Sequence, residues 1–128
     1  MEPSYEQRRV FDAPVERVWQ AWTDPAMVRD WYGPTPEQCK VEVMDVKEGG
    51  VYRRFMGEHL DEGMYHAVEA PARLVQGSKD KAFLVETLLA GDGDQTHMTL
   101  RMYGTDPAGN EHMLAAWNAG FDKLDRLL

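Results

Sequence analysis

The C-terminal segment of the chain repeats apolar residues at the spacing of a helix. Its apolar positions are Met113, Leu114, Trp117, Gly120, Phe121, Leu124, Leu127 and Leu128. Residues three and four positions apart lie on one side of an α-helix, so this segment predicts a long amphipathic helix that runs to the end of the chain. A helix of this kind needs a second layer of structure to cover its apolar side. The rest of the chain must supply that layer.

The middle of the chain, residues 38–100, predicts the covering layer as a β-sheet. Turn signals such as EGG (48–50) and GDGDQ (91–95) separate segments of β type. We expect six strands here, in CKVEVMDV, VYRRFM, MYHAVEA, APARLV, AFLVETLLA and THMTLRMY. The first should place Cys39, Val41 and Val43 on one face, and GEHLDEG (57–63) should turn or continue as a weak strand. Short connections imply antiparallel pairing.

The N-terminal third predicts one strand and two short helices. SYEQRRVF (4–11) favours a strand with Tyr5, Gln7, Arg9 and Phe11 on one face. Helical spacing then relates Val15, Val18, Trp19 and Trp22, and afterwards Met27, Val28, Trp31 and Tyr32. Asp12 and Asp24 are candidate helix caps, Gly33 and Pro34 are stop signals, and Asp106 or Asn110 could cap the last helix. The whole order indicates an α+β layered domain.

Composition narrows the function classes. A chain of 128 residues has the length of one domain, which we place at residues 1–128. Its 14 basic and 22 acidic residues give a net charge of −8 without a basic stripe, which disfavours nucleic acids and anionic membrane surfaces as partners. Cys39 is the single cysteine, and no histidine spacing suggests a metal site. No apolar run could insert into a membrane, and we expect a cytoplasmic protein.

Several segments in order resemble one known family. They are FDAPVERVWQAWTDPAMVRDWYGP (11–34), EGGVY (48–52), GMYHAVEAPARLV (63–75), GDGDQTHMTLRM (91–102) and AWNAGFDKLDRLL (116–128). They are similar to the bacterial SRPBCC proteins of the START-like superfamily, in the branch named after the activator of the heat-shock-protein ATPase. The resemblance implies the helix-grip fold: a curved seven-stranded antiparallel sheet wrapped around a long C-terminal helix, with two short helices after strand one.

The chain departs from the family pattern at a few positions. Tyr32 stands in place of a second Trp, and Ala70 and Ala116 replace a Pro and a Gly. The family usually has an aromatic residue two positions after Tyr52, where this chain has Arg54. Strand alternation would turn Arg54 inward with Tyr52, where a buried guanidinium could orient an acidic or carbonyl-bearing ligand. A bulge or another register would instead turn Arg54 to solvent.

Candidate catalytic groups are few, and we assign none of them a catalytic role. His66 could line a cavity as an acid or base, or lie on the surface opposite Tyr65. Glu86 could join other strand carboxylates in acid–base work, or face solvent, and alternation does not settle its face. Cys39 has no evident base partner.

The resemblance implies an apolar cavity between the sheet and the last helix, where we expect the domain to bind an apolar or aromatic small molecule. We expect neither a cofactor nor a metal. Two alternatives stay open: an enzyme of the polyketide cyclase or dehydratase type in the same cavity, and a protein-interaction module related to chaperone co-factors. The sequence also leaves a homodimer open. Trp19 and Trp22 should anchor the first helix, and the second helix should lie near the cavity mouth. We expect the ligand to contact Trp31, Tyr32, Tyr52, Arg54, Tyr65, Trp117 and Phe121.

Overall fold

The computed structural model describes residues 2–32, 39–104 and 111–128. The described elements follow in the order β1 (Tyr5–Phe11), α1 (Val15–Thr23), α2 (Pro25–Trp31), β2 (Cys39–Met44), β3 (Val51–Met56), β4 (His59–Glu69), β5 (Arg73–Gly77), β6 (Leu84–Asp92), β7 (Gln95–Tyr103) and α3 (Glu111–Leu127). This confirms the predicted order of elements. The predicted stop at Gly33 and Pro34 and the predicted caps at Asp106 and Asn110 lie outside the described residues.

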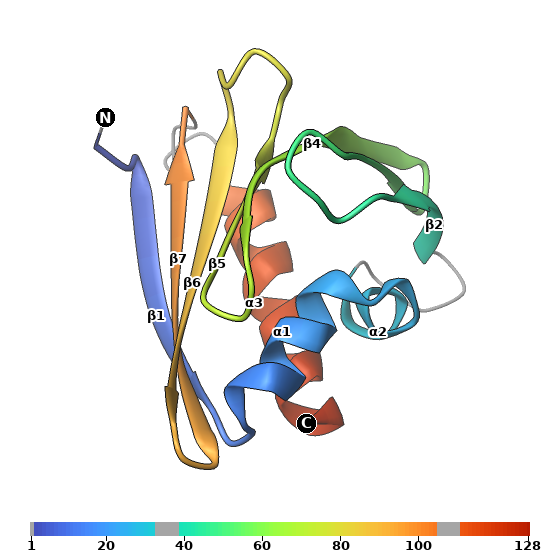
Figure 1. Ribbon diagram of the computed structural model, residues 1–128. Helices are drawn as coiled ribbons and strands as arrows, with labels where there is room; N and C mark the ends of the chain where they lie inside the picture. Colours follow the sequence, from blue (N-terminus) through green and yellow to red (C-terminus); the bar gives the residue numbers. More distant parts are fainter. Residues whose placement is uncertain (1, 33–38, 105–110) are drawn as a thin grey trace.

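The described strands form one antiparallel sheet in the order β1-β7-β6-β5-β4-β3-β2. Each strand from β2 to β7 pairs with the strand next to it in the sequence. Strand β1 pairs with β7 and forms the edge of the sheet opposite β2. The sheet is strongly curved, so that β2 to β4 turn across the end of α3, while β1, β7 and β6 stand along it (Figure 1). Helices α1 and α2 lie beside the half of α3 that leads to the C-terminus (Figure 1). The predicted helix-grip fold is confirmed.

Strand alternation divides the sheet into a concave core face and an outer polar face. On β7, Met98, Leu100 and Met102 are buried in the core, whereas Arg101 points to the outer face. On α3 the predicted apolar face is the buried one, although Leu127 at its end is 42% exposed. Fully burying one large apolar side chain contributes roughly 1.5–3 kcal/mol, so the alternation fixes which face of each strand meets α3.

The two short helices are held by different means. The Asp24 side chain accepts a hydrogen bond from the Ala26 backbone N–H at 3.0 Å, which confirms the predicted cap of α2. The expectation for Asp12 is wrong, because α1 starts after Pro14 without a side-chain cap. The Trp31 indole N–H donates to the Ala21 carbonyl at 2.8 Å and ties α2 to α1. No described helix combines the length and apolar character needed to cross a membrane.

Two register shifts alter what strict alternation predicts. In β2 a shift between Val41 and Val43 leaves Val43 40% exposed and turns Met44 toward the core, so the prediction that Val43 shares a face with Cys39 is wrong. The segment after Gly57 continues as a strand, and β4 reaches Glu69 with a second shift after Tyr65. Both irregularities lie in the part of the sheet that bends around α3, where bulges increase twist and curvature.

Candidate functional site

Alternation along β3 turns Arg54 into the concave interior. Tyr52 and Arg54 are 4% and 2% exposed. The alternate residues of the same strand, Val51 and Arg53, are exposed to solvent. The alternative in which Arg54 points to solvent is therefore wrong. A guanidinium with this little exposure needs acceptors close by, because burying an unpaired charge is very costly.

Asp61 supplies the counter-charge from the neighbouring strand. The register of β3 and β4 sets Arg54 directly opposite Asp61, and Arg54 Nη2 donates to Asp61 Oδ2 at 2.9 Å. The Tyr32 hydroxyl at the end of α2 donates to the same oxygen at 3.0 Å. The Asp61 side chain is 22% exposed, so this ion pair lies where the interior meets solvent. One carboxylate thus connects β3, β4 and α2.

Two aromatic rings flank the Arg54 guanidinium. Its Cζ lies 4.5 Å from the centre of the Tyr32 ring and 4.3 Å from the centre of the Tyr52 ring. Contacts of this kind stabilise a cation by about 0.5–2 kcal/mol. Burial by itself would lower the pKa of Arg54, but its interactions with Tyr32 and Asp61 outweigh burial and raise that pKa. The side chain therefore stays charged.

Two hydrogen-bond donors of the polar side chains at this site have no acceptor, and the buried indole N–H of Trp22 in the same interior is a third. In the described part of the chain, neither Arg54 Nε nor the buried Tyr65 hydroxyl has a hydrogen-bond partner. Burial raises the pKa of Tyr65 to about 12, which keeps it a neutral phenol able to donate its proton. A buried polar group without a partner costs about 1–3 kcal/mol, and native proteins contain few of them. Both side chains border the Tyr52 ring, whose centre is 5.3 Å from that of Tyr65.

Gly63 makes room for this arrangement. It lies opposite Tyr52 in the register of β3 and β4. A Cβ added at Gly63 would lie 2.6 Å from the Tyr52 hydroxyl oxygen and 2.3 Å from the Gly77 carbonyl oxygen. Real Cβ atoms do not approach backbone oxygens this closely, so any larger residue would displace the strand or the Tyr52 ring.

An aromatic cluster adjoins the polar groups. The Tyr32 ring meets Trp31 and Trp117 edge-on, with centroid distances of 5.5 Å in both pairs. Phe121 lies 5.9 Å from Trp31 and 5.6 Å from Trp117 by the same measure. Tyr32 therefore belongs to both groups, with its ring among the aromatic residues and its hydroxyl on Asp61.

The structure brings all seven predicted ligand contacts into the concave interior, in two adjoining groups. We call Tyr32, Tyr52, Arg54, Asp61 and Tyr65 the polar cluster, and Trp31, Trp117 and Phe121, with Trp22, the aromatic cluster. Sequence reasoning did not single out Asp61 as the partner of Arg54. The opposite charges in VYRRFM and GEHLDEG were visible, but only the strand register pairs them.

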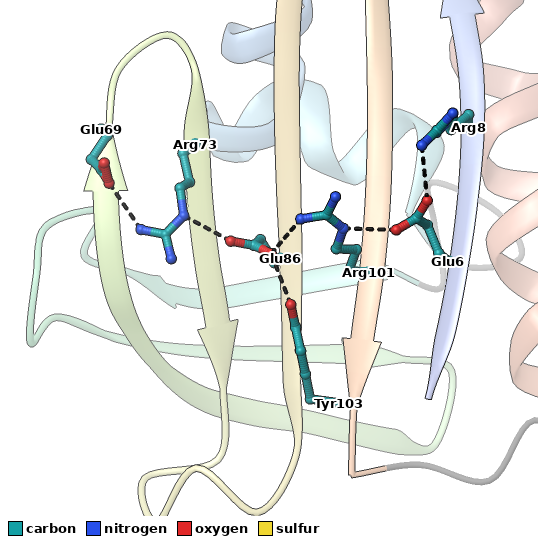
Figure 2. Close-up of polar contacts among 7 residues, drawn as sticks. All are labelled: Glu6, Arg8, Glu69, Arg73, Glu86, Arg101 and Tyr103. Atoms are coloured by element: carbon teal, nitrogen blue, oxygen red, sulfur yellow. Dashed lines mark hydrogen bonds and ion pairs between the residues drawn. The ribbon is translucent and has the colours of Figure 1, made fainter. Parts of the chain in front are cut away.

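Glu86 and His66 belong to other surroundings. Glu86 lies on the outer face of the sheet in a row of charged side chains that crosses five strands (Figure 2). Arg73 Nε donates to Glu86 at 2.8 Å and the Tyr103 hydroxyl donates to it at 3.1 Å. His66 Nε2 donates to the Ser78 carbonyl at 2.8 Å.

The outer row holds Glu86 as a structural anion. Burial alone would raise the pKa of Glu86, but the hydrogen bonds from Arg73 and Tyr103 outweigh it and lower that pKa. Burial raises the pKa of the Cys39 thiol, so Cys39 is not an activated nucleophile. In residues 2–32, 39–104 and 111–128, no three side chains of His, Cys, Asp or Glu come close enough to hold a metal ion.

Comparison with known proteins gives the chain its family. The family model described as "Activator of Hsp90 ATPase homolog 1-like protein" (AHSA1) matches residues 12–128. The chain belongs to the AHSA1 family. The match covers every element of this AHSA1 chain after β1, and with it both the polar and the aromatic cluster. None of the curated proteins matches the chain.

Solved structures share the fold of this AHSA1 chain. A Chromobacterium violaceum protein is 23% identical with a TM-score of 0.79, over 97% of this chain and 96% of its own. A Mycobacterium smegmatis protein is 22% identical with a TM-score of 0.78, over 95% and 88%. CalU16 from Micromonospora echinospora is 27% identical with a TM-score of 0.72, over 95% and 71%.

Proposed function

We propose that this AHSA1 chain binds an apolar small molecule in its concave interior, between the sheet and α3. The fold family to which it belongs generally binds hydrophobic ligands. The observation that carries the proposal is the pair of buried donors, Arg54 Nε and the Tyr65 hydroxyl, that have no acceptor among the described residues. A bound molecule with an acceptor group would remove that cost.

The two clusters suit the two ends of one ligand. Arg54 and Tyr65 offer polar contacts, and the adjoining rings of Tyr32 and Trp117 offer an apolar surface. Small-molecule sites commonly combine mostly apolar walls with a few placed polar groups. The partly exposed Asp61 marks the side on which the polar cluster meets solvent.

The other two functions have no specific observation in their favour. For an enzyme of the polyketide cyclase or dehydratase type, the interior carboxylate Asp61 is engaged by Arg54 and Tyr32, and Glu86 lies on the opposite face of the sheet. For a chaperone-related interaction module, the described surface offers no feature that points to a protein partner. We therefore propose neither.

A direct test combines native mass spectrometry of freshly purified protein with a titration. The titration uses acetylnaphthalene and follows tryptophan fluorescence, because Trp22, Trp31 and Trp117 lie together at the proposed site. We expect saturable one-to-one binding that raises the melting temperature. Phe121→Leu removes a ring from the aromatic cluster and should weaken binding about tenfold, whereas Leu127→Ala, at an exposed position on the same helix, should leave it unchanged. If no probe binds saturably and no molecule co-purifies, the proposal is wrong.

A further inference from the structure

We infer that the ligand group facing Arg54 and Tyr65 is a neutral carbonyl rather than a carboxylate. The inference rests on the proposed function and specifies its ligand class. The sequence left both groups open, because a buried arginine could serve either. The polar cluster distinguishes them by its charge and by its hydrogen-bonding capacity.

The charge of Arg54 is already compensated. Asp61 accepts a hydrogen bond from Arg54 at 2.9 Å, and the cluster therefore contains one positive and one negative charge. A ligand carboxylate would add a second negative charge beside Asp61 in surroundings with little water. Two anions near a single cation in a desolvated site repel each other, and the added anion must also lose its hydration.

On the Tyr65 side of the cluster, the surroundings do not favour an additional anion. Asp45 also interacts electrostatically with Tyr65 and acts against negative charge there. Tyr32, Tyr52 and Tyr65 contribute no charge, because their raised pKa values keep all three as neutral phenols. The net charge of the whole chain, −8, adds a weaker unfavourable field for an approaching anion.

The hydrogen-bonding groups fit a carbonyl oxygen. Arg54 Nε–H can only donate, and the Tyr65 hydroxyl is free to donate. A carbonyl oxygen brings two lone pairs, no proton and no charge, so it can accept a hydrogen bond from either donor without adding a new unpaired group. A hydrocarbon of the same shape would leave both donors without acceptors. A site built to hydrogen-bond a ligand rejects the analogue that lacks the matching group.

Three naphthalenes of nearly equal shape test this inference. They are acetylnaphthalene, naphthoate and isopropenylnaphthalene, all substituted at the same ring position, which offer a ketone, a carboxylate and a hydrocarbon. We expect the ketone to bind about tenfold more tightly than the hydrocarbon, because it satisfies the buried donors. The carboxylate should bind about a hundredfold more weakly than the ketone.

Two variants separate charge from hydrogen bonding. Asp61→Asn keeps an acceptor for Arg54 but removes the compensating charge, so the preference should shift toward naphthoate by at least about tenfold. Tyr65→Phe removes one donor and no charge, and it should weaken the ketone about fivefold while leaving the hydrocarbon unchanged. Tyr103→Phe removes a tyrosine hydroxyl from the outer face and should change neither affinity. Tyr65→Phe deletes an unpaired buried hydroxyl and is expected to fold.

The outcomes of this experiment distinguish the inference from the proposed function. If wild-type protein binds naphthoate at least as tightly as acetylnaphthalene, or if Tyr65→Phe weakens ketone and hydrocarbon equally, the carbonyl assignment is wrong while ligand binding stands. If none of the three naphthalenes binds, the proposed function itself fails. Binding of the ketone with the expected ranking, weakened on Tyr65→Phe and shifted toward the carboxylate by at least about tenfold on Asp61→Asn, supports both.

Discussion

Replacing Asp61 by Ala should destabilise the protein far more than replacing its neighbour Glu62 by Ala. Both carboxylates lie on β4 and pair with an arginine of β3, Asp61 with Arg54 at 2.9 Å and Glu62 with Arg53 at 2.8 Å. The two pairs differ in burial. The Arg54 side chain is 3% exposed, whereas those of Arg53 and Glu62 are 44% and 56% exposed.

The magnitude follows from this difference. Removing one partner of a buried ion pair typically costs about 3–5 kcal/mol, because the other charge remains buried and uncompensated. Asp61 is 22% exposed, so water can partly replace its carboxylate, and we expect a loss of about 3 kcal/mol. An exposed pair contributes about 1 kcal/mol or less, which sets the expectation for Glu62→Ala. A double variant, Asp61→Ala with Arg54→Met, should recover part of the loss, since it leaves no buried charge.

Urea unfolding followed by tryptophan fluorescence and circular dichroism measures these free energies of unfolding. Coincidence of the two signals checks that unfolding is two-state. Equal losses of about 1 kcal/mol for Asp61→Ala and Glu62→Ala would refute the reasoning, because Arg54 would then not be a buried cation that depends on Asp61. A double variant that is less stable than Asp61→Ala would refute the account of the recovery.

Two further predictions concern the tyrosines and the α2–α3 contact. The pKa of Tyr65 is raised from 10.0 to about 12, so the folded state holds a proton that the unfolded state loses above about pH 10. The free energy of unfolding should therefore fall between about pH 10 and pH 12, with Tyr65 contributing about 1.4 kcal/mol per pH unit. Urea unfolding at several pH values should show a shallower fall with pH for Tyr65→Phe than for the wild-type protein. Gly120→Val should lower the free energy of unfolding by about 2 kcal/mol in the same assay, because a Cβ added at Gly120 would lie only 3.2 Å from the Trp31 carbonyl oxygen. Ala119→Val, at an exposed position of the same helix, should lower it by less than about 1 kcal/mol.

The sequence predicted the elements because their periodicity is a local property. The spacing of Trp117, Phe121 and Leu124 is enough to define the buried side of α3, and alternation is enough to turn Tyr52 and Arg54 to the same face of β3. The prediction for Val43 was wrong, because the register shift in β2 depends on how that strand pairs with β3 in a curved sheet. Irregularities of this kind have no clear signal within a single strand.

The candidate site was predictable only in part, for a related reason. Every predicted contact residue lies in the interior, but the meaning of Arg54 depends on Asp61, which reaches it through the pairing of two strands. Helical spacing also could not show that Tyr32, at the end of α2, contributes its hydroxyl to that pair. The sequence did not decide the face of Glu86, because LVETLLA places apolar residues on both faces of the strand. The ion pairs of Glu86 with Arg73 and Arg101 place it on the outer face.

The pairing of β1 with β7 has a consequence for the newly made chain. Residues 5–11 are synthesised before every other described strand, yet their partner strand is Gln95–Tyr103. At the usual rate of translation, the two segments leave the ribosome roughly 4–18 seconds apart. During that interval the hairpins from β2 to β6 can form, because each joins neighbours in the sequence. Segment 5–11 stays without its partner strand during that interval. Its glutamate, its glutamine and its two arginines make the unpaired segment polar, which protects it from aggregation.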